Sequence, residues 1–158
     1  MFDDIIQHLP YKSSFLFVDH ITALDAGGVT GDYTLNANSF FYEDHFVNNP
    51  VTPGVIITEI MAQIGVVVLG IYLIKSGNTK EDVKMGKHSF PLLTSTDVSF
   101  FKMVLPGEKV IVTSKKLYFR FGKLKCAIEM HNEASELIAK GIFSGMIKNS
   151  PAEEGANE

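Results

Sequence analysis

The sequence contains only one cysteine, Cys126, among its 158 residues. One cysteine excludes an intramolecular disulfide and is typical of a reducing compartment. The chain also does not open with a charged n-region followed by an apolar stretch, so we expect a cytoplasmic protein without a secretory signal. Cys126 lies in an alternation of apolar residues, and we expect it to pack inward as a small hydrophobe rather than to act as a nucleophile.

Patterns that hold metals, nucleotides or nucleic acids are also missing. The five histidines show no metal-ligand spacing and no H-E-x-x-H motif, and no glycine-rich nucleotide-binding loop is present. The net charge is −4, and basic residues do not interleave with aromatic ones, which argues against nucleic acid as a partner. We therefore expect any reaction at this chain to run without a metal or a cofactor.

A long apolar run at residues 60–74 contains no charged residue. A membrane span needs about twenty residues, and Glu59 and Lys75 bracket this shorter run, so a buried helix is favoured over a span. The apolar side chains around Ile56 to Ile71 cover most of the helix circumference. A helix of this kind must be surrounded on most sides, and a curved sheet can do that.

Strand-like runs occur on both sides of this helix. Gly27 and Gly28 indicate a hairpin turn between the first two runs, and alternation is clearest in the run that contains Cys126. Strands, one helix and further strands predict an α+β fold in a single domain over residues 1–149. The acidic end, residues 150–158, has no apolar periodicity and is expected to be a disordered tail. The predicted strands are 15–24, 29–35, 92–102, 109–121, 124–131 and 137–147.

Residues 40–63 carry the strongest functional pattern, F-F-Y-E-D-H-F-V-N-N-P-V-T-P-G-V-I-I-T-E-I-M-A-Q. His45 precedes a Pro-Gly turn, and a histidine can take up and return a proton near neutral pH, which suits a general base. Glu59 lies among apolar residues, and the loss of solvation there would raise the pKa of its carboxyl group. A protonated Glu59 could bind or protonate a departing hydroxyl.

The start of the helix lies between these two residues. We expect Thr52 to cap the helix and Pro53 to occupy its first position. The amide of Gly54 would then lie at the positive end of the helix dipole without a partner, where it can hold a carbonyl oxygen that is turning into an enolate. The three parts together suit removal of a proton α to a thioester carbonyl with loss of a β-hydroxyl.

Each part also has a simpler interpretation. A single loop histidine is commonly a surface or turn residue, and a T-P-G sequence commonly marks nothing more than the start of a helix. Glu59 carries the most weight, because an unpaired charge in an apolar helix is costly.

The same segment resembles the signature of the β-hydroxyacyl-acyl carrier protein dehydratases of bacterial type II fatty acid synthesis, the FabZ/FabA-like family. That signature reads G-H-F-P-x-x-P-x-M-P-G-V-x-x-x-E-x-x-A-Q, and residues 44–63 match its spacing without a gap. L-P-Y-K-S-S-F-L-F-V-D-H at 9–20 resembles the family's L-P-H-R-Y-P-F-L-L-V-D-R, and F-F-K-M-V-L-P-G-E at 100–108 resembles F-R-R-P-V-x-P-G-D. The three segments also follow one another in the family's order.

The resemblance implies a hotdog fold, in which an antiparallel sheet wraps around one long central helix. It implies dehydration of (3R)-hydroxyacyl-acyl carrier protein to the trans-2-enoyl product, with His45 as the catalytic histidine and Glu59 as the catalytic acid. Gly54 and Val55 would be the backbone donors to the thioester carbonyl. In this family the histidine of one protomer faces the glutamate of the other, which implies a homodimer and leaves a trimer of dimers open.

Three positions depart from the family's signature. Asp44 replaces the glycine before the histidine, Val47 replaces a proline, and Thr52 replaces the methionine before Pro-Gly. None of these changes removes a reacting group. They leave the acyl chain length, the pH optimum and the precise substrate open.

Two sets of residues could bind the carrier-linked substrate. Twelve phenylalanines and six methionines can supply an apolar slot for the acyl chain, although core packing is the alternative for each of them. Six basic residues and no acid fall between Lys109 and Ala127, which indicates either a solvated strand face or a surface that docks acidic acyl carrier protein. The slot candidates are Phe90, Phe100, Phe101 and Met103, and the docking candidates are Lys102 and Arg120.

Two other functions stay open from the sequence. Hotdog proteins also include acyl thioesterases, which direct water at the carbonyl carbon. A non-catalytic acyl-binding subunit of a polyketide or aryl-polyene pathway is the third hypothesis.

Overall fold

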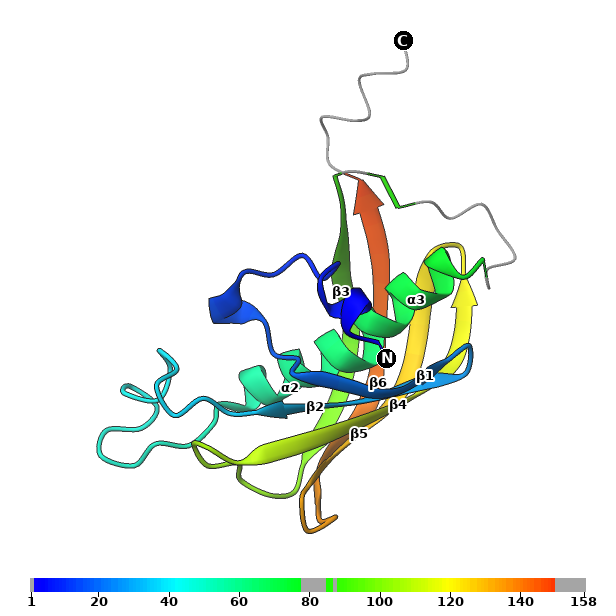
Figure 1. Cartoon of the computed structure of the whole chain (residues 1–158). Helices are drawn as coiled ribbons and strands as arrows, with labels where there is room; N and C mark the ends of the chain where they lie inside the picture. Colours follow the sequence, from blue (N-terminus) through cyan, green and yellow to red (C-terminus); the bar gives the residue numbers. More distant parts are fainter. Residues whose placement is uncertain (1, 78–84, 87, 150–158) are drawn as a thin grey trace.

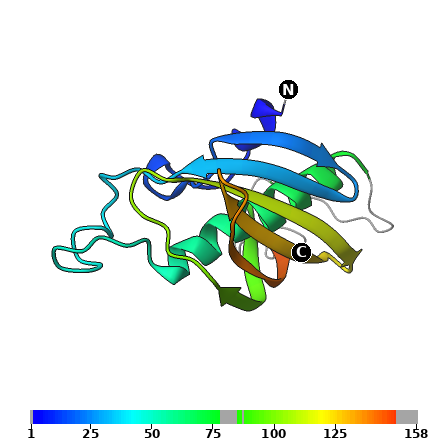
Figure 2. The same cartoon turned by 90° about the horizontal axis from the view of Figure 1, so that it is seen from below.

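A computed structural model describes residues 2–77, 85–86 and 88–149, and the predicted acidic tail lies outside them. One long helix crosses the concave side of a curved sheet (Figures 1 and 2). The helical elements are α1 (Asp3–Ile6), the 3₁₀ turn η1 (Ser13–Phe15), α2 (Gly54–Ala62), the π-helical turn η2 (Gln63–Val68) and α3 (Leu69–Lys75). The strands are β1 (His20–Asp25), β2 (Gly28–Thr34), β3 (Ser89–Phe100), β4 (Lys109–Arg120), β5 (Lys123–Asn132) and β6 (Leu137–Asn149).

The central helix is continuous from α2 through η2 to α3. Most of its apolar residues are buried as predicted, with Ile60, Ile64 and Leu69 fully covered. The stretch is apolar enough to cross a membrane, but most of it is enclosed by the protein itself. Gly65 permits the close approach of helix and sheet, because a Cβ there would lie 2.4 Å from Ile128 Cδ1.

Within the described residues, the sheet has six antiparallel strands in the order β1-β2-β4-β5-β6-β3. Side chains alternate along β5, so Leu124, Cys126, Ile128 and Met130 are buried against the helix. Cys126 is fully buried, which confirms the predicted inward orientation, and this burial raises the pKa of its thiol to about 11. The sheet wrapped around one helix confirms the predicted hotdog fold.

The prediction fails at the beginning of the first strand. Ser13–Phe15 forms a 3₁₀ turn, and β1 begins only at His20. The intervening residues do not pair as a strand, because the amide of Phe17 donates to the side chain of Gln63 on the central helix at 2.9 Å. This contact ties the N-terminal segment to the helix turn that carries Glu59.

Candidate active site

His45 lies in the loop between β2 and α2, and its ring is fixed by the backbone. Its Nδ1 atom lies 2.8 Å from the Val51 carbonyl oxygen, and the Val51 amide donates to the His45 carbonyl oxygen at 2.9 Å. A carbonyl oxygen only accepts, so Nδ1 carries the hydrogen and Nε2 of the neutral ring keeps its lone pair. The ring also stacks on Phe46, with centroids 4.1 Å apart. Nε2 is therefore available as a proton acceptor.

The central helix begins one residue later than expected. Pro53 is the N-cap and Gly54 the first helical residue, so the predicted roles of Thr52 as cap and Pro53 as first residue are wrong. Thr52 is buried, and its hydroxyl lies 2.6 Å from the hydroxyl of Tyr42 instead. This contact ties the helix start to the loop that carries His45.

Within the part of the chain that the structure describes, the first two amides of the helix have no protein acceptor. The Pro53 carbonyl accepts from Ile56 and Ile57, but no backbone partner exists for the amides of Gly54 and Val55 within the described residues. Both residues are exposed, and the ring of Phe100 lies beside Gly54, where an added Cβ would meet it at 3.4 Å. The two predicted oxyanion donors can therefore donate hydrogen bonds to a ligand oxygen.

Glu59 is half-buried on the second turn of the helix. Its Oε1 accepts a 2.9 Å hydrogen bond from Nε2 of Gln63, which is fully buried. Gln63 also donates to the Phe15 carbonyl and accepts from the Phe17 amide, so the amide group cannot turn away. Burial raises the pKa of Glu59, and the bond from Gln63 offsets part of that rise. The site favours a protonated acid more than water does.

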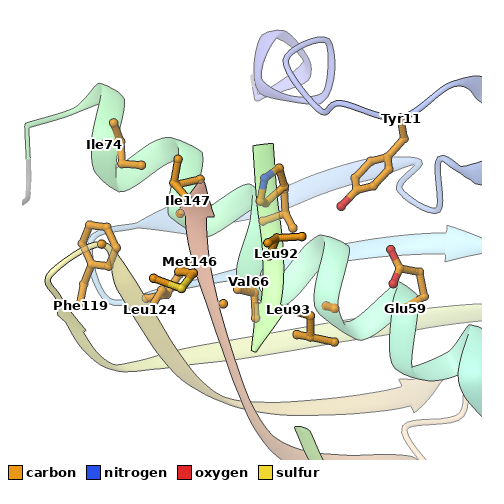
Figure 3. A pocket seen from close by; sticks show the side chains of 16 residues that line it. Tyr11, Glu59, Val66, Ile74, Leu92, Leu93, Phe119, Leu124, Met146 and Ile147 are labelled. Carbon is orange, nitrogen blue, oxygen red and sulfur yellow. The ribbon is translucent and has the colours of Figure 1, made fainter. Parts of the chain in front are cut away.

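Glu59 opens onto an apolar pocket between the central helix and the strands β3, β5 and β6 (Figure 3). Tyr11 and Glu59 supply its polar side chains and lie together at one end, whereas Ile74 and Phe119 lie at the other. The wall between them is formed by apolar residues and glycines. Prominent wall residues are Val66, Leu92, Leu93, Leu124, Met146 and Ile147.

The four sequence-predicted slot residues do not line this pocket. Phe100, Phe101 and Met103 are exposed at the end of β3 and in the segment after it, and Phe90 is partly exposed near the start of β3. The wall instead uses residues brought together by strand pairing, such as Leu92 opposite Met146.

His45 and Glu59 do not meet within one chain. His45 is not among the residues that line the pocket, and the described residues contain no hydrogen bond or ion pair between the two. The loop between β2 and α2 extends beyond the body of the sheet (Figure 1). Within the described residues of a single chain, His45 and Glu59 therefore do not interact directly.

The two docking candidates lie at opposite ends of the sheet. Phe100, two residues before Lys102, pairs with Ala139 of β6. Arg120 ends β4, and Lys123 at the start of β5, on the other side of the turn, pairs with Met146 of β6. Seven residues of strand separate those positions, or about 23 Å. Lys102 forms a 2.7 Å ion pair with Glu136, and the Arg120 guanidinium lies over the Tyr118 ring. Lys102 and Arg120 therefore do not lie on one common surface of a single chain.

Sequence reasoning missed two residues of the site, Gln63 and Tyr11. A buried glutamine four residues after Glu59 was the available signal for Gln63, because side chains at i and i+4 meet on a helix. Tyr11 gave no local signal, because it reaches Glu59 from a different part of the chain. Within the described ranges, no cluster of three or more histidine, cysteine or acidic side chains could hold a metal ion.

Comparisons with known proteins identify the relatives of this chain. Residues 9–129 match the model of the FabA-like domain family. The chain is 35% identical over 130 residues to a 3-hydroxyacyl-[acyl-carrier-protein] dehydratase FabZ of Psychrobacter arcticus, covering 80% of this chain and 84% of the relative. It is 31% identical over 149 residues to the FabZ dehydratase of Lawsonia intracellularis, covering 92% and 91%.

Solved structures show the same fold at low sequence identity. The dehydratase heterocomplex ApeI:P from Xenorhabdus doucetiae superposes with a TM-score of 0.73 at 13% identity, covering 98% of this chain and 97% of that chain. A hypothetical thioesterase with coenzyme A from Streptococcus pneumoniae gives a TM-score of 0.57 at 9% identity, with 83% and 86% covered.

Proposed function

Because the chain belongs to the FabA-like family, with FabZ dehydratases among its relatives, we propose that it dehydrates 3-hydroxyacyl-acyl carrier protein to the trans-2-enoyl thioester in cytoplasmic fatty acid biosynthesis. The observation that carries the proposal is the combination of three prepared groups. His45 offers a free Nε2, Gly54 an unpartnered amide, and Glu59 a carboxyl group whose pKa burial raises. Proton abstraction, enolate stabilisation and protonation of a leaving hydroxyl need these three functions.

The proposed reaction begins with His45 Nε2 taking the α-proton. The C–H electron pair forms the new double bond, the C–O bond at the β-carbon breaks, and the Glu59 acid gives its proton to the departing hydroxyl, which leaves as water. The amide of Gly54, and that of Val55 beside it, donates to the thioester oxygen while that oxygen carries enolate charge. The proton on His45 then returns to the Glu59 carboxylate before the next turnover.

A homodimer would bring the two reacting side chains together. Strand β3 is an edge strand, with Leu92, Leu93 and Phe100 each more than two fifths exposed. An open edge with apolar side chains is suited to pairing with a second chain. Val55, Phe101 and Met103 extend the exposed apolar area to the helix start and the segment after β3. We propose that two copies join here, so that His45 of one protomer faces Glu59 of the partner subunit.

The acyl chain has room in the pocket behind Glu59. Its apolar walls suit a hydrocarbon chain, and its polar end suits the reacting carbons. Phe100, beside Gly54, would contact the thioester end. Phe90, Phe101 and Met103 would contribute to the slot only with the second chain in place.

Incubation with 3-hydroxyacyl carrier proteins of several chain lengths tests the proposal, with mass spectrometry to detect loss of one water. His45→Ala should lower kcat by at least about 10²-fold, the scale of losing a general base. His8→Ala, at an exposed position, is the control and should retain activity. Release of free thiol without an enoyl product would favour the thioesterase alternative. Acyl-carrier binding with neither product would favour a non-catalytic subunit.

A further inference from the structure

Tyr11 brings a hydroxyl group to the polar end of the pocket. Its side chain and that of Glu59 both direct their oxygens into the pocket from opposite walls (Figure 3). The Tyr11 ring packs near that of Phe15, with centroids 6.2 Å apart. The Phe15 carbonyl in turn accepts from Gln63, the residue that holds Glu59. The segment 11–15 therefore positions both Tyr11 and Gln63, the residue that orients the Glu59 carboxyl group.

The Tyr11 hydroxyl has a proton to donate, and no group among the described residues receives it. Burial raises the pKa of Tyr11 above its ordinary value, and negative charge on Glu59 is a second, smaller cause. The hydroxyl therefore stays protonated at neutral pH. Within the described residues the hydroxyl forms no hydrogen bond, and it is not bonded to Glu59. A half-buried donor that faces a pocket without a partner is suited to a ligand oxygen.

We propose that the Tyr11 hydroxyl donates a hydrogen bond to the β-hydroxyl oxygen of the substrate, and that it thereby selects substrates that carry this group. The inference rests on the proposed dehydration. Glu59 supplies the proton that leaves with the water, and Tyr11 keeps its own proton throughout. With Tyr11 and Glu59 on opposite sides of the leaving oxygen, the C–O bond is held in one orientation, and negative charge that develops on that oxygen is stabilised.

The same position also offers a substitution that restores a donor. The dehydratase signature has L-P-H-R where this chain has L-P-Y-K, so histidine replaces Tyr11 in the pattern that the segment resembles. A neutral imidazole keeps one N–H donor, whereas phenylalanine keeps only the ring. Tyr11→His and Tyr11→Phe therefore separate the donor from the bulk of the side chain.

Binding in the non-reacting His45→Ala background tests the recognition directly. The two probes are a 3-hydroxyacyl carrier protein and the saturated acyl carrier protein of the same length, which lacks the β-hydroxyl. Tyr11→Phe should weaken binding of the hydroxylated probe about tenfold and change binding of the saturated probe less than about twofold, because only one hydrogen bond is lost. Tyr11→His should recover part of the difference. Tyr72→Phe, on the helix away from the pocket, removes a hydroxyl as a control and should change neither.

Turnover gives the second readout. With His45 intact, Tyr11→Phe should lower kcat for dehydration about tenfold or more. An equal loss for both probes would assign Tyr11 a packing role, and unchanged binding and kcat would also overturn the inference. A wild-type protein that does not dehydrate would refute the proposed function, whereas the ratio of the two binding constants would still decide whether Tyr11 recognises the hydroxyl.

Discussion

The side-chain amide of Gln63 donates to Glu59 Oε1 at 2.9 Å, one helical turn from the carboxyl group that it orients. Gln63 is fully buried, and the 15–17 segment holds its other bonds at 2.9 Å each. A buried amide held by three hydrogen bonds from two sides has one orientation. The direction of the Glu59 carboxyl group is therefore set by a residue that does not react.

Replacement of Gln63 should impair the reaction more than binding. Gln63→Met keeps much of the side-chain length but leaves the Phe17 amide and the Phe15 carbonyl without partners, so we expect a loss of about 1–3 kcal/mol in the free energy of unfolding. Because Glu59 also loses its orientation, kcat should fall about tenfold or more while KM changes little. Steady-state kinetics and urea unfolding measure the two effects.

Ser114→Ala is the matched control for Gln63→Met. Ser114 donates to the Gly65 carbonyl of the same helix at 2.8 Å, so this change also removes a buried hydrogen bond. It should destabilise the fold and leave kcat near the wild-type value. If both variants lose activity in proportion to stability, Gln63 has no separate positioning role.

Lys102 should affect carrier docking through its charge. Lys102→Glu should raise KM for carrier-bound substrate while sparing a small thioester analogue, because the carrier is acidic and the analogue is not. Glu136→Gln breaks the same 2.7 Å ion pair but keeps the lysine charge, and it should not raise KM. Equal effects of the two variants would attribute the result to the ion pair. Arg120→Glu, at the far end of the sheet, tests whether the second predicted cation takes part.

Phe119 should limit the length of the acyl chain. It lines the end of the pocket opposite Glu59, so Phe119→Ala should shift the preference toward longer chains. Burial of one more methylene contributes about 0.8 kcal/mol, or about fourfold in kcat/KM. Phe121→Ala, at an exposed residue of the adjacent turn, should leave the chain-length profile unchanged. An identical profile in Phe119→Ala would place the end of the acyl chain elsewhere.

Much of the architecture follows from local sequence. Alternation of apolar residues predicted β4, β5 and β6 to within about two residues, and the apolar run predicted the central helix. Both patterns are local properties of the chain. Residues 15–19 were misassigned as strand, since a buried side chain of the helix replaces the strand partner of Phe17. Thr52 was misassigned as a cap, since Tyr42 binds its hydroxyl. Both errors depend on tertiary contacts.

The residues of the site also divide into those that local sequence predicts and those that only tertiary contacts bring together. His45, Gly54 and Glu59 lie in one contiguous motif and could be identified from it. The pocket could not, because its wall combines residues such as Leu92 and Met146 that only strand pairing brings together. Tyr11 likewise lines the same pocket as Glu59 only because the N-terminal segment packs against the helix.

We propose that His45 of one protomer works with Glu59 of the partner subunit, and a mixture of two inactive variants tests this pairing. His45→Ala and Glu59→Gln should each be inactive alone. When they are unfolded together in equal amounts and refolded, about half of the dimers should be mixed, and each mixed dimer should contain one intact site. We predict recovery of about a quarter of wild-type dehydration activity per protomer. If the mixture is no more active than the separate variants, the shared site is wrong.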